Sequence, residues 1–362
     1  MDSAVASLVQ HIRAAGAQRM PLRIRGGGTK DFYGERLEGE LLDTSGLRGI
    51  VSYEPSELVV TVRAGTPLAA LEQVLAASGQ SLPFEPPHFG SGATVGGMVS
   101  AGLSGPARGS VGSVRDYVLG LQMIDGRGEE LVFGGQVMKN VAGYDVSRLL
   151  AGAMGTLGLI TEVSLKVLPV APAEATLRFR VNQQEALRRL NAWGGQPLPL
   201  NASRWLEEGG AGTLYLRLRG AVAAVEAACR ALGGDRLENA EAAAHWNAAR
   251  EQALPWFSEL GERDLWRVSV PQTAPVLDLP EPPLVEWHGA QRWVRTDAAG
   301  GVHVRQVALA AGGHATLFRT ARADARARMT PLAPALATIH EQLKKQFDPA
   351  LVFNRGRLYP HF

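Results

Sequence analysis

Glycine is distributed unevenly along this chain, and that distribution limits its fold more than any other feature. Of the 42 glycines, 27 lie in residues 1–170 and 15 in residues 171–362, whereas all seven tryptophans follow residue 190. Glycine has no Cβ, so its backbone can turn sharply or approach another group closely. The first part is therefore expected to press its backbone against a ligand or itself, and the second to bury large aromatic side chains. A length of 362 residues fits about two domains.

Composition excludes several classes of protein. The 37 basic and 35 acidic residues nearly cancel, so we expect no nucleic-acid partner. The single cysteine, Cys229, can supply neither an internal disulfide nor the thiolates of an iron–sulfur cluster. The N-terminus lacks a signal-peptide pattern and no apolar run of 18 residues occurs, so we expect no membrane span. We expect a cytoplasmic protein that reaches the inner face of the membrane, if at all, through partners.

Hydrophobic patterning predicts an α+β fold with a boundary at Pro169–Pro172. We expect domain limits of 1–172, 173–325 and 326–362, the last segment returning to the first domain. A hydroxyl cap at Thr66 and Pro67 predicts a helix ending near Gly79. Further helices are expected at 147–153, 184–193, 221–232, 240–252 and 332–346. Strands are expected at 21–25, 58–62, 117–124, 131–133, 162–167, 177–181, 214–218, 265–270, 292–295 and 316–319.

Two glycine-dense segments are candidate binding loops. Arg25-Gly-Gly-Gly-Thr-Lys30 follows a strand, and its three glycines let successive N–H groups line one concavity that suits a pyrophosphate. The alternative for this segment is a plain hairpin loop. Phe89-Gly-Ser-Gly-Ala-Thr-Val-Gly-Gly97 and the following Ser100–Gly105 are poor helix or strand formers and suit contact with a flat ligand. A long irregular loop is the alternative, although Val95, Met98 and Val99 favour ordered packing.

A third segment, Gly152-Ala-Met-Gly-Thr-Leu-Gly158, has the spacing of a dinucleotide fingerprint. A strand follows it where a helix should begin, which argues against a Rossmann nicotinamide site. Three glycine-dense loops in one domain imply one long cofactor, and FAD fits because it combines a pyrophosphate, an adenosine and a flat ring.

These loops and several other segments together resemble the vanillyl-alcohol-oxidase (PCMH-type) family of FAD-binding proteins. The order of the motifs matches, from 25–30 and 93–97 through 112–120, 138–145 and 155–161 to 347–356. Val137–Asp145, Leu265–Pro271 and Gly313–Arg319 more narrowly resemble the FAD-binding E subunits of bacterial glycolate oxidase. The resemblance implies the PCMH-type two-subdomain FAD-binding fold with a smaller α+β cap.

The resemblance also implies roles for particular residues. The loop at 25–30 would hold the pyrophosphate, 94–97 would lie beside the flavin ring and ribityl chain, and 155–160 would follow the cofactor with backbone contacts. Asn354 and Arg355 would return to the flavin domain. The candidate cofactor-binding residues are Arg25, Gly26, Gly27, Gly28, Thr29, Lys30, Gly92, Thr94, Val95, Gly96, Gly97, Gly105, Gly112, Gly155, Leu157, Gly158, Ile160, Asn354 and Arg355.

Departures from the family pattern shape the functional expectation. Thr29-Lys30 stands where many relatives place a histidine joined to the flavin, so we expect non-covalent FAD. The Gly-Asp-Gly-Asn segment of hydroxy-acid dehydrogenases is missing, and Glu286-Trp-His-Gly289 is a partial match to their Glu-His-Gly. No pair of the eight histidines has metal-ligand spacing, so we expect no metal site. The sequence assigns no catalytic residue: His314 is a possible base, and Arg267 or Arg319 a possible carboxylate clamp, but structural roles are favoured.

The resemblance implies an FAD-binding subunit of a glycolate oxidase (dehydrogenase) complex, which converts glycolate to glyoxylate. A larger FAD-linked subunit would oxidise the substrate, and electrons would pass to an iron–sulfur subunit, in keeping with the lone cysteine. Two alternatives stay open: a self-sufficient FAD-dependent hydroxy-acid or alcohol oxidoreductase, and a non-catalytic scaffold that kept the flavin fold.

Overall fold

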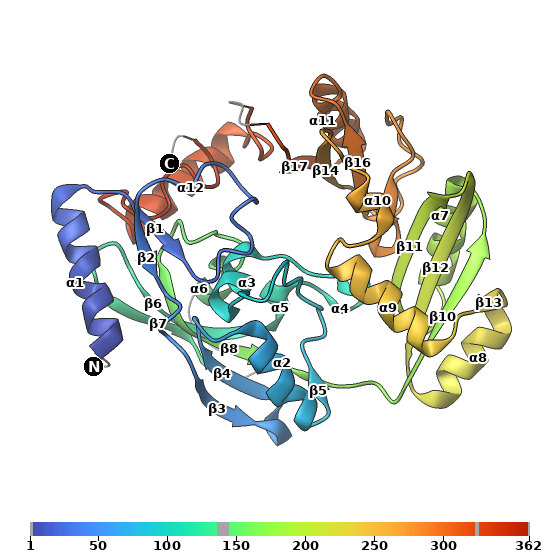
Figure 1. Ribbon diagram of the computed structural model, residues 1–362, viewed down its shortest axis with the longest axis horizontal. Helices are drawn as coiled ribbons and strands as arrows, with labels where there is room; N and C mark the ends of the chain where they lie inside the picture. Colours follow the sequence, from blue (N-terminus) through green and yellow to red (C-terminus); the bar gives the residue numbers. More distant parts are fainter. Residues whose placement is uncertain (1–2, 136–144, 323–325, 361–362) are drawn as a thin grey trace. The chain divides into compact units, whose positions relative to one another are not determined.

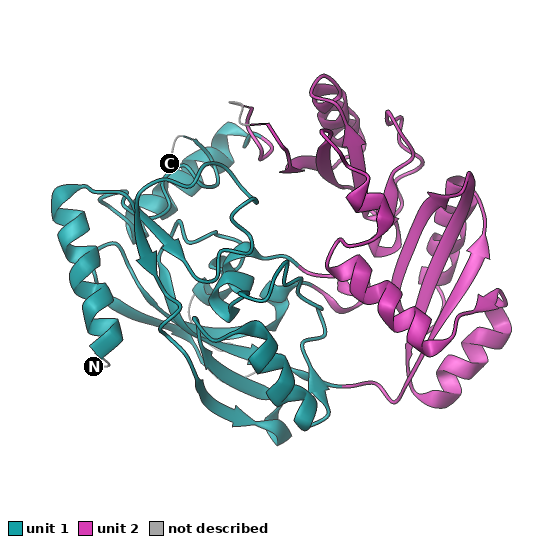
Figure 2. Cartoon of the chain, in the orientation of Figure 1, with its two compact units in different colours: residues 1–103, 113–169, 331–362 teal, residues 104–112, 170–330 magenta. Residues whose placement is uncertain are grey.

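The computed structural model describes residues 3–135, 145–322 and 326–360. They form two compact units: unit 1 comprises 1–103, 113–169 and 331–362, and unit 2 comprises 104–112 and 170–330 (Figure 2). The domain limits expected from the sequence stay a prediction. The two units differ from the expected limits, because residues 104–112 belong to unit 2 and not to the first domain. Most of the family-like motif at 137–145 lies outside the described residues.

Unit 1 combines helices with a mainly antiparallel set of strands (Figure 1). Its helices are α1 (Ser3–Gln18), η1 (Pro55–Glu57), α2 (Leu68–Ala77), α3 (Val95–Ala101), α5 (Val114–Tyr117), α6 (Val146–Leu149) and α12 (Pro334–Phe347). Its strands are β1 (Leu22–Arg25), β2 (Glu40–Asp43), β3 (Ile50–Glu54), β4 (Val59–Arg63), β5 (Gln80–Ser81), β6 (Val118–Ile124), β7 (Glu130–Gly134), β8 (Leu159–Lys166) and β9 (Leu168–Pro169).

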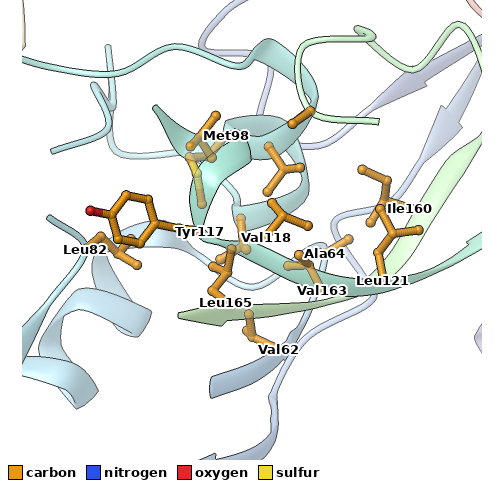
Figure 3. Close-up of a cluster of buried hydrophobic side chains, with 14 of the residues drawn as sticks. Val62, Ala64, Leu82, Met98, Tyr117, Val118, Leu121, Ile160, Val163 and Leu165 are labelled. Carbon is orange, nitrogen blue, oxygen red and sulfur yellow. The ribbon is translucent and has the colours of Figure 1, made fainter. Parts of the chain in front are cut away.

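A five-stranded antiparallel sheet, in the order β3-β4-β8-β6-β7, forms the centre of unit 1. One of its faces carries a core of aliphatic side chains to which α2, α3 and α5 contribute. Figure 3 shows part of this core, with Met98 of α3 and Tyr117 of α5 beside sheet residues such as Val163. A smaller parallel pair, β1-β2, packs with α1 on a second apolar cluster.

Unit 2 is built on one eight-stranded antiparallel sheet, in the order β13-β10-β12-β11-β15-β16-β14-β17. Its strands are β10 (Ala173–Arg180), β11 (Leu200–Glu208), β12 (Ala211–Gly220), β13 (Asp235–Arg236), β14 (Asp264–Ser269), β15 (Leu284–Glu286), β16 (Gln291–Thr296) and β17 (His314–Arg319). Its helices are α4 (Arg108–Val111), α7 (Gln183–Gly194), α8 (Val222–Leu232), α9 (Asn239–Arg250), α10 (Pro255–Ser258), η2 (Trp287–Gly289) and α11 (Gly300–Ala310).

The two faces of this sheet differ in chemistry. One face is apolar. Helices α7 and α8 pack on an apolar cluster over one half of this face, and α11 packs on a similar cluster over the other half. The opposite face carries Arg204, Tyr215, Arg217 and Glu286, with α9 supplying side chains against them. Helices thus cover antiparallel sheets in both units, which confirms the expected α+β class.

Two expectations about helices were wrong. The segment expected to be a poor helix former contains α3, because Thr94 caps it through its Oγ1, 3.3 Å from the Gly97 nitrogen, and Gly102 ends it at φ +65°. Close packing of Gly96 on Ala64, which a Cβ would meet at 2.7 Å, offsets the low helix propensity of glycine. Thr66 does not cap α2: its hydroxyl bonds to the backbone of Gly49, and Pro67 occupies the cap position.

A buried ion pair attaches α12 to the rest of unit 1. Lys344 is 1 % exposed, and its Nζ donates to Asp348 Oδ2 and to the carbonyls of Thr156 and Phe353, each at 2.7 Å. All three ammonium hydrogens therefore have acceptors. Asp348 also accepts the backbone N–H groups of Val352 (3.0 Å) and Phe353 (2.8 Å). Burial lowers the pKa of Lys344, and Asp348 opposes that shift.

Replacing Lys344 with methionine should lower the free energy of unfolding by about 3–5 kcal/mol, because the Asp348 carboxylate is then buried without its cation. Urea unfolding followed by circular dichroism measures the change. Lys345→Met is the matched control, since Lys345 is exposed and should change stability by less than about 0.5 kcal/mol. Equal stability of the two variants would contradict this role for the ion pair.

Candidate FAD-binding site

A cleft in unit 1 gathers residues from four distant parts of the sequence. It encloses about 580 Å³ of empty space, part of it open to solvent. Its lining residues are Ile24, Arg25, Gly26, Gly27, Gly28, Thr29, Lys30, Asp31, Tyr33, Leu37, Thr94, Gly97, Ser100, Ala101, Met154, Asn354 and Arg357. The structure therefore brings the expected 25–30 loop together with Thr94, Gly97 and Asn354.

The glycine loop offers hydrogen-bond donors to this cleft. Within the described chain, the backbone N–H groups of Gly26, Gly27 and Gly28 donate to no other residue. Gly28 has φ +71°, which side-chain-bearing residues rarely adopt. Unpaired amides of consecutive residues that carry no Cβ suit a phosphate group. These residues fit the pyrophosphate of FAD.

The two cations beside the loop have protein partners. Arg25 Nε lies 2.7 Å from Asp31 Oδ2, which offsets much of its charge. Lys30 Nζ donates to the His88 carbonyl at 3.1 Å and lies 5.7 Å from the ring centre of Phe89. The backbone amides are therefore the principal groups for an anion here, and the side-chain cations contribute at longer range.

The glycines of the first two loops pack directly against each other. A Cβ built on Gly27 would overlap the carbonyl group of Gly92, and one on Gly26 would overlap the Thr94 side chain. Gly97 lies beside Thr94 Oγ1, 3.0 Å from an added Cβ. Part of the glycine density thus serves contact between two segments of backbone, and this contact positions α3 next to the 25–30 loop.

Asn354 connects the C-terminal segment to both sides of the cleft. Its Oδ1 accepts the Ile24 N–H at 2.7 Å, and its Nδ2 donates to the Met154 carbonyl at 2.6 Å. A Cβ on Gly155, which has φ +72°, would lie 2.7 Å from the same Nδ2. The asparagine therefore fixes the end of β1 against the 152–158 segment.

Other expected site residues lie behind the cleft or away from it. Val95 and Ile160 are buried in the unit 1 core, Leu157 is 7 % exposed, and Gly158 packs on Met123. Arg355 is exposed and donates to the Leu351 carbonyl. Direct contact of these residues, and of Gly92, Gly96 and Gly155, with the cofactor stays a prediction.

Gly105 and Gly112 belong to unit 2. The Gly105 carbonyl accepts the Trp287 indole N–H at 3.0 Å, and Arg108 stacks on the same ring at 4.4 Å. Gly112, at φ +93°, ends α4. Ser110 Oγ lies 2.8 Å from His288 Nε2, so this segment is attached to the 286–289 turn. Their expected contact with the cofactor also stays a prediction.

The list of candidate cofactor-binding residues left out Tyr33, Ser100, Met154 and Arg357, although Ser100 and Met154 lie in segments that the sequence analysis had singled out. Arg357 is 6 % exposed and donates to the carbonyls of Glu35, Asp31 and Tyr33, which holds the turn after the glycine loop. The pattern Asn-Arg-Gly-Arg after Asn354 marks both Arg355 and Arg357 as candidates without separating them, and the structure buries the second.

Among residues 3–135, 145–322 and 326–360, no helix has the length and hydrophobicity of a membrane span. In the same ranges, no three histidine, cysteine, aspartate or glutamate side chains gather in an arrangement that could hold a metal ion.

Comparisons with known proteins define the class first. Residues 3–134 match the model of the FAD binding domain family. A structure of alkyldihydroxyacetonephosphate synthase superposes with a TM-score of 0.65, covering 96 % of this chain and 74 % of that one at 14 % identity, which shows a shared fold. The fold is that of the PCMH-type FAD-binding proteins, and FAD is confirmed as the cofactor of this kind of domain.

The chain is 45 % identical over 353 residues to glycolate oxidase subunit GlcE of Escherichia coli K12, covering 98 % of this chain and 97 % of that protein. It belongs to this family of glycolate oxidase subunits. Glycolate oxidase subunit GlcD of Bacillus subtilis 168 is 35 % identical over 162 residues, which are 44 % of this chain and 34 % of that protein. The similarity to GlcD thus spans about a third of that longer protein.

Replacing Gly27 with alanine should displace the glycine loop from Gly92 and reduce bound FAD more than about tenfold, since a loss of ~1.4 kcal/mol in binding free energy already gives tenfold. The flavin absorbance per folded chain measures this. Gly46→Ala is the control, because an added Cβ there meets no atom within 4 Å. A folded Gly27→Ala protein with the parent flavin content would show that this contact does not shape the site.

Stability should also fall as the pH drops from about 6.5 to about 4. Burial lowers the pKa of His288 to about 4, so the unfolded chain binds a proton in this window that the folded chain does not. The shift corresponds to roughly 3 kcal/mol. His288→Asn, which tolerates the local φ of +56°, should remove part of the fall. Urea unfolding at pH 7, 5.5 and 4 measures it, and an unchanged profile in the variant would contradict it.

Proposed function

We propose that this chain is the FAD-binding subunit of a glycolate oxidase complex that converts glycolate to glyoxylate. The observation that carries the proposal is similarity over nearly the whole length to a protein named as such a subunit. The cleft in unit 1 supports it independently, because the three glycine amides offer donors that suit a diphosphate.

Each part of the cleft has a role in holding the cofactor. The amides of Gly26–Gly28 bind the pyrophosphate, and Thr94 keeps α3 close to that loop by capping the helix. Asn354 and Arg357 hold the two backbone segments that border the loop. When bound, FAD supplies a hydride acceptor, and the protein's part is to orient it and exclude water.

FAD is bound here without a covalent bond. Thr29 and Lys30 occupy the place where relatives with a covalent link carry a histidine, and neither side chain is one that forms such a link. His88, whose carbonyl accepts from Lys30 at 3.1 Å, pairs through its Nε2 with Glu72 at 3.0 Å.

The other redox groups reside on partner chains. A larger FAD-linked subunit oxidises glycolate, and an iron–sulfur subunit accepts the electrons, since one cysteine cannot ligate a cluster. The similarity to GlcD over the flavin-binding part supports a paralogous relation between the two flavin subunits. The complex works on the cytoplasmic side, with any attachment to the inner face of the membrane made through its partners.

Purification of the tagged chain from its native host tests these points together. We expect one FAD per chain, released into the supernatant by acid precipitation, and two co-purifying subunits, one of them an iron–sulfur protein. With glycolate as the substrate, the complex should reduce an electron-accepting dye. Glycolate should not bleach the flavin of the isolated chain.

Each contrary result has a distinct meaning. Flavin that stays with the precipitate contradicts the non-covalent site. A chain without FAD favours the scaffold alternative. Bleaching of the isolated chain by glycolate shows a self-sufficient oxidoreductase and contradicts the division of work between subunits.

A further inference from the structure

Asp31 is an unexpected residue in a cleft that suits a diphosphate. Among the described residues that line the cleft, Arg25, Lys30 and Arg357 carry positive charge, and Asp31 is the only one with a carboxylate. A diphosphate is anionic, so a carboxylate beside it opposes its binding. The glycine loop alone gives no reason for an acidic residue at this position.

Arg25 and Asp31 form an isolated ion pair at the two sides of the loop. Arg25 Nε donates to Asp31 Oδ2 at 2.7 Å, and within the described chain neither side chain has another hydrogen-bond partner. The two side chains are 38 % and 35 % exposed, so solvent reaches both. An ion pair this exposed adds little to the stability of a fold. Its main effect is therefore on the charge that the cleft presents.

The backbone holds Asp31 in the position where it meets Arg25. The Asp31 N–H donates to the Gly28 carbonyl at 3.1 Å, and the Asp31 carbonyl accepts from Nη2 of the buried Arg357 at 2.9 Å. The carboxylate takes no part in either bond. It is thus placed beside the loop by contacts that a change of its charge leaves intact.

Gly28 provides the space in which the guanidinium of Arg25 lies. A Cβ built on Gly28 would overlap Arg25 Nη2 and Cζ and would lie 2.6 Å from Nε. The positive charge of Arg25 is therefore directly against the glycine loop, next to backbone amides that donate to no other residue of the described chain. Asp31 sets how much of that charge a bound anion meets.

Phosphate anions differ in their charge, and a nearby carboxylate affects them unequally. A terminal phosphate carries a charge of about −1.5 to −2 at pH 7, whereas each phosphate of a diester carries a single negative charge. Coulombic repulsion is proportional to the charge of the ligand. A carboxylate at the loop therefore opposes free pyrophosphate more than it opposes the diester diphosphate of a dinucleotide such as FAD.

We propose that Asp31, by neutralising Arg25, makes the glycine loop select the diester diphosphate of a dinucleotide over free pyrophosphate and other terminal phosphates. The uncharged amides supply the hydrogen bonds that both kinds of ligand use, and the balanced pair removes the excess positive charge that would favour the more highly charged one. Asp31 is thus a specificity-determining residue that acts through Arg25. The proposal deepens the proposed FAD site and rests on it only for the identity of the dinucleotide.

Calorimetric titration of the full chain, freed of FAD, with inorganic pyrophosphate and with FAD at pH 7 tests the proposal. Asp31→Asn removes the negative charge but keeps an oxygen that can accept from Arg25 Nε. In low salt we expect this variant to bind pyrophosphate about fivefold or more tightly than the parent, and FAD about threefold. Both gains should largely disappear at about 0.5 M salt, because added ions screen charges that solvent reaches.

A double-mutant cycle separates charge from support of the loop. Arg25→Gln leaves Asp31 without its cation and should weaken pyrophosphate binding more than about fivefold. The double variant Arg25→Gln/Asp31→Asn restores the net charge of the parent pair and should bind pyrophosphate within about twofold of the parent. Asp235→Asn is the matched control, because Asp235 pairs with Arg178 at 3.3 Å in unit 2. It should bind both ligands like the parent, and thermal unfolding checks that every variant is folded.

The proposal is overturned if Asp31→Asn binds pyrophosphate no more tightly than the parent, if FAD gains as much as pyrophosphate, or if the gains persist at high salt. A double variant as weak as Arg25→Gln equally contradicts it, because Asp31 would then support the loop and not restrain its charge. Failure of the proposed function has a different sign, a native complex without flavin or without partner subunits, and the pyrophosphate titration can still be read in that case.

Discussion

The ammonium group of Lys344 is surrounded by three oxygen acceptors, and the placement of the flavin cleft depends on this arrangement. One acceptor, the Thr156 carbonyl, belongs to the 152–158 segment, and another, the Phe353 carbonyl, belongs to the chain's end. Next to it, Leu22 of β1 bonds through its N–H to Val352 at 2.7 Å and through its carbonyl to Asn354 at 2.9 Å. The buried cation thus fixes the segment that extends the β1-β2 pair, and β1 leads directly into the glycine loop. A lysine buried with every hydrogen bonded positions backbone more rigidly than apolar packing does, because each bond has a direction.

Much of the fold could be predicted from alternation and helical periodicity. Strands β8, β10 and β12 and helices α7 and α8 lie close to their expected ranges, since each has one apolar face that the core requires. The failure at α3 has a physical cause. Glycine disfavours an isolated helix, but Gly96 permits the helix to pack on Ala64 of the neighbouring turn, and that contact lies far away in the sequence. The expected helix at 147–153 shrinks to the four residues of α6, and the following Gly152, at φ +87°, packs against Gly102 at the end of α3.

The candidate FAD-binding site likewise has a part that could be predicted from the sequence and a part that could not. The 25–30 loop was recognisable because three consecutive glycines follow a strand and can line one concavity with N–H groups, and Thr94 was assigned through the resemblance to the PCMH-type family. The roles of Gly26 and Gly27 could not be separated from the sequence: both are required, but by the neighbouring Thr94 and Gly92 as much as by a ligand. The choice between Arg355 and Arg357 was likewise beyond local reasoning. The two are chemically alike, and only the carbonyls of 31–35, more than three hundred residues away, determine which one is buried.

Unit 2 presents the same sheet to two different environments. Its apolar face, covered by α7, α8 and α11, accounts for the stability of the unit through buried hydrocarbon. The polar face contributes less, because burying charged and polar groups costs solvation that incomplete hydrogen bonding does not recover. Arg204 contacts the rings of Tyr215 and Trp246, and Glu286 accepts from Trp293 and Gln291. These directed contacts fix the orientation of the side chains on this face, although the unpaired groups among them cost stability.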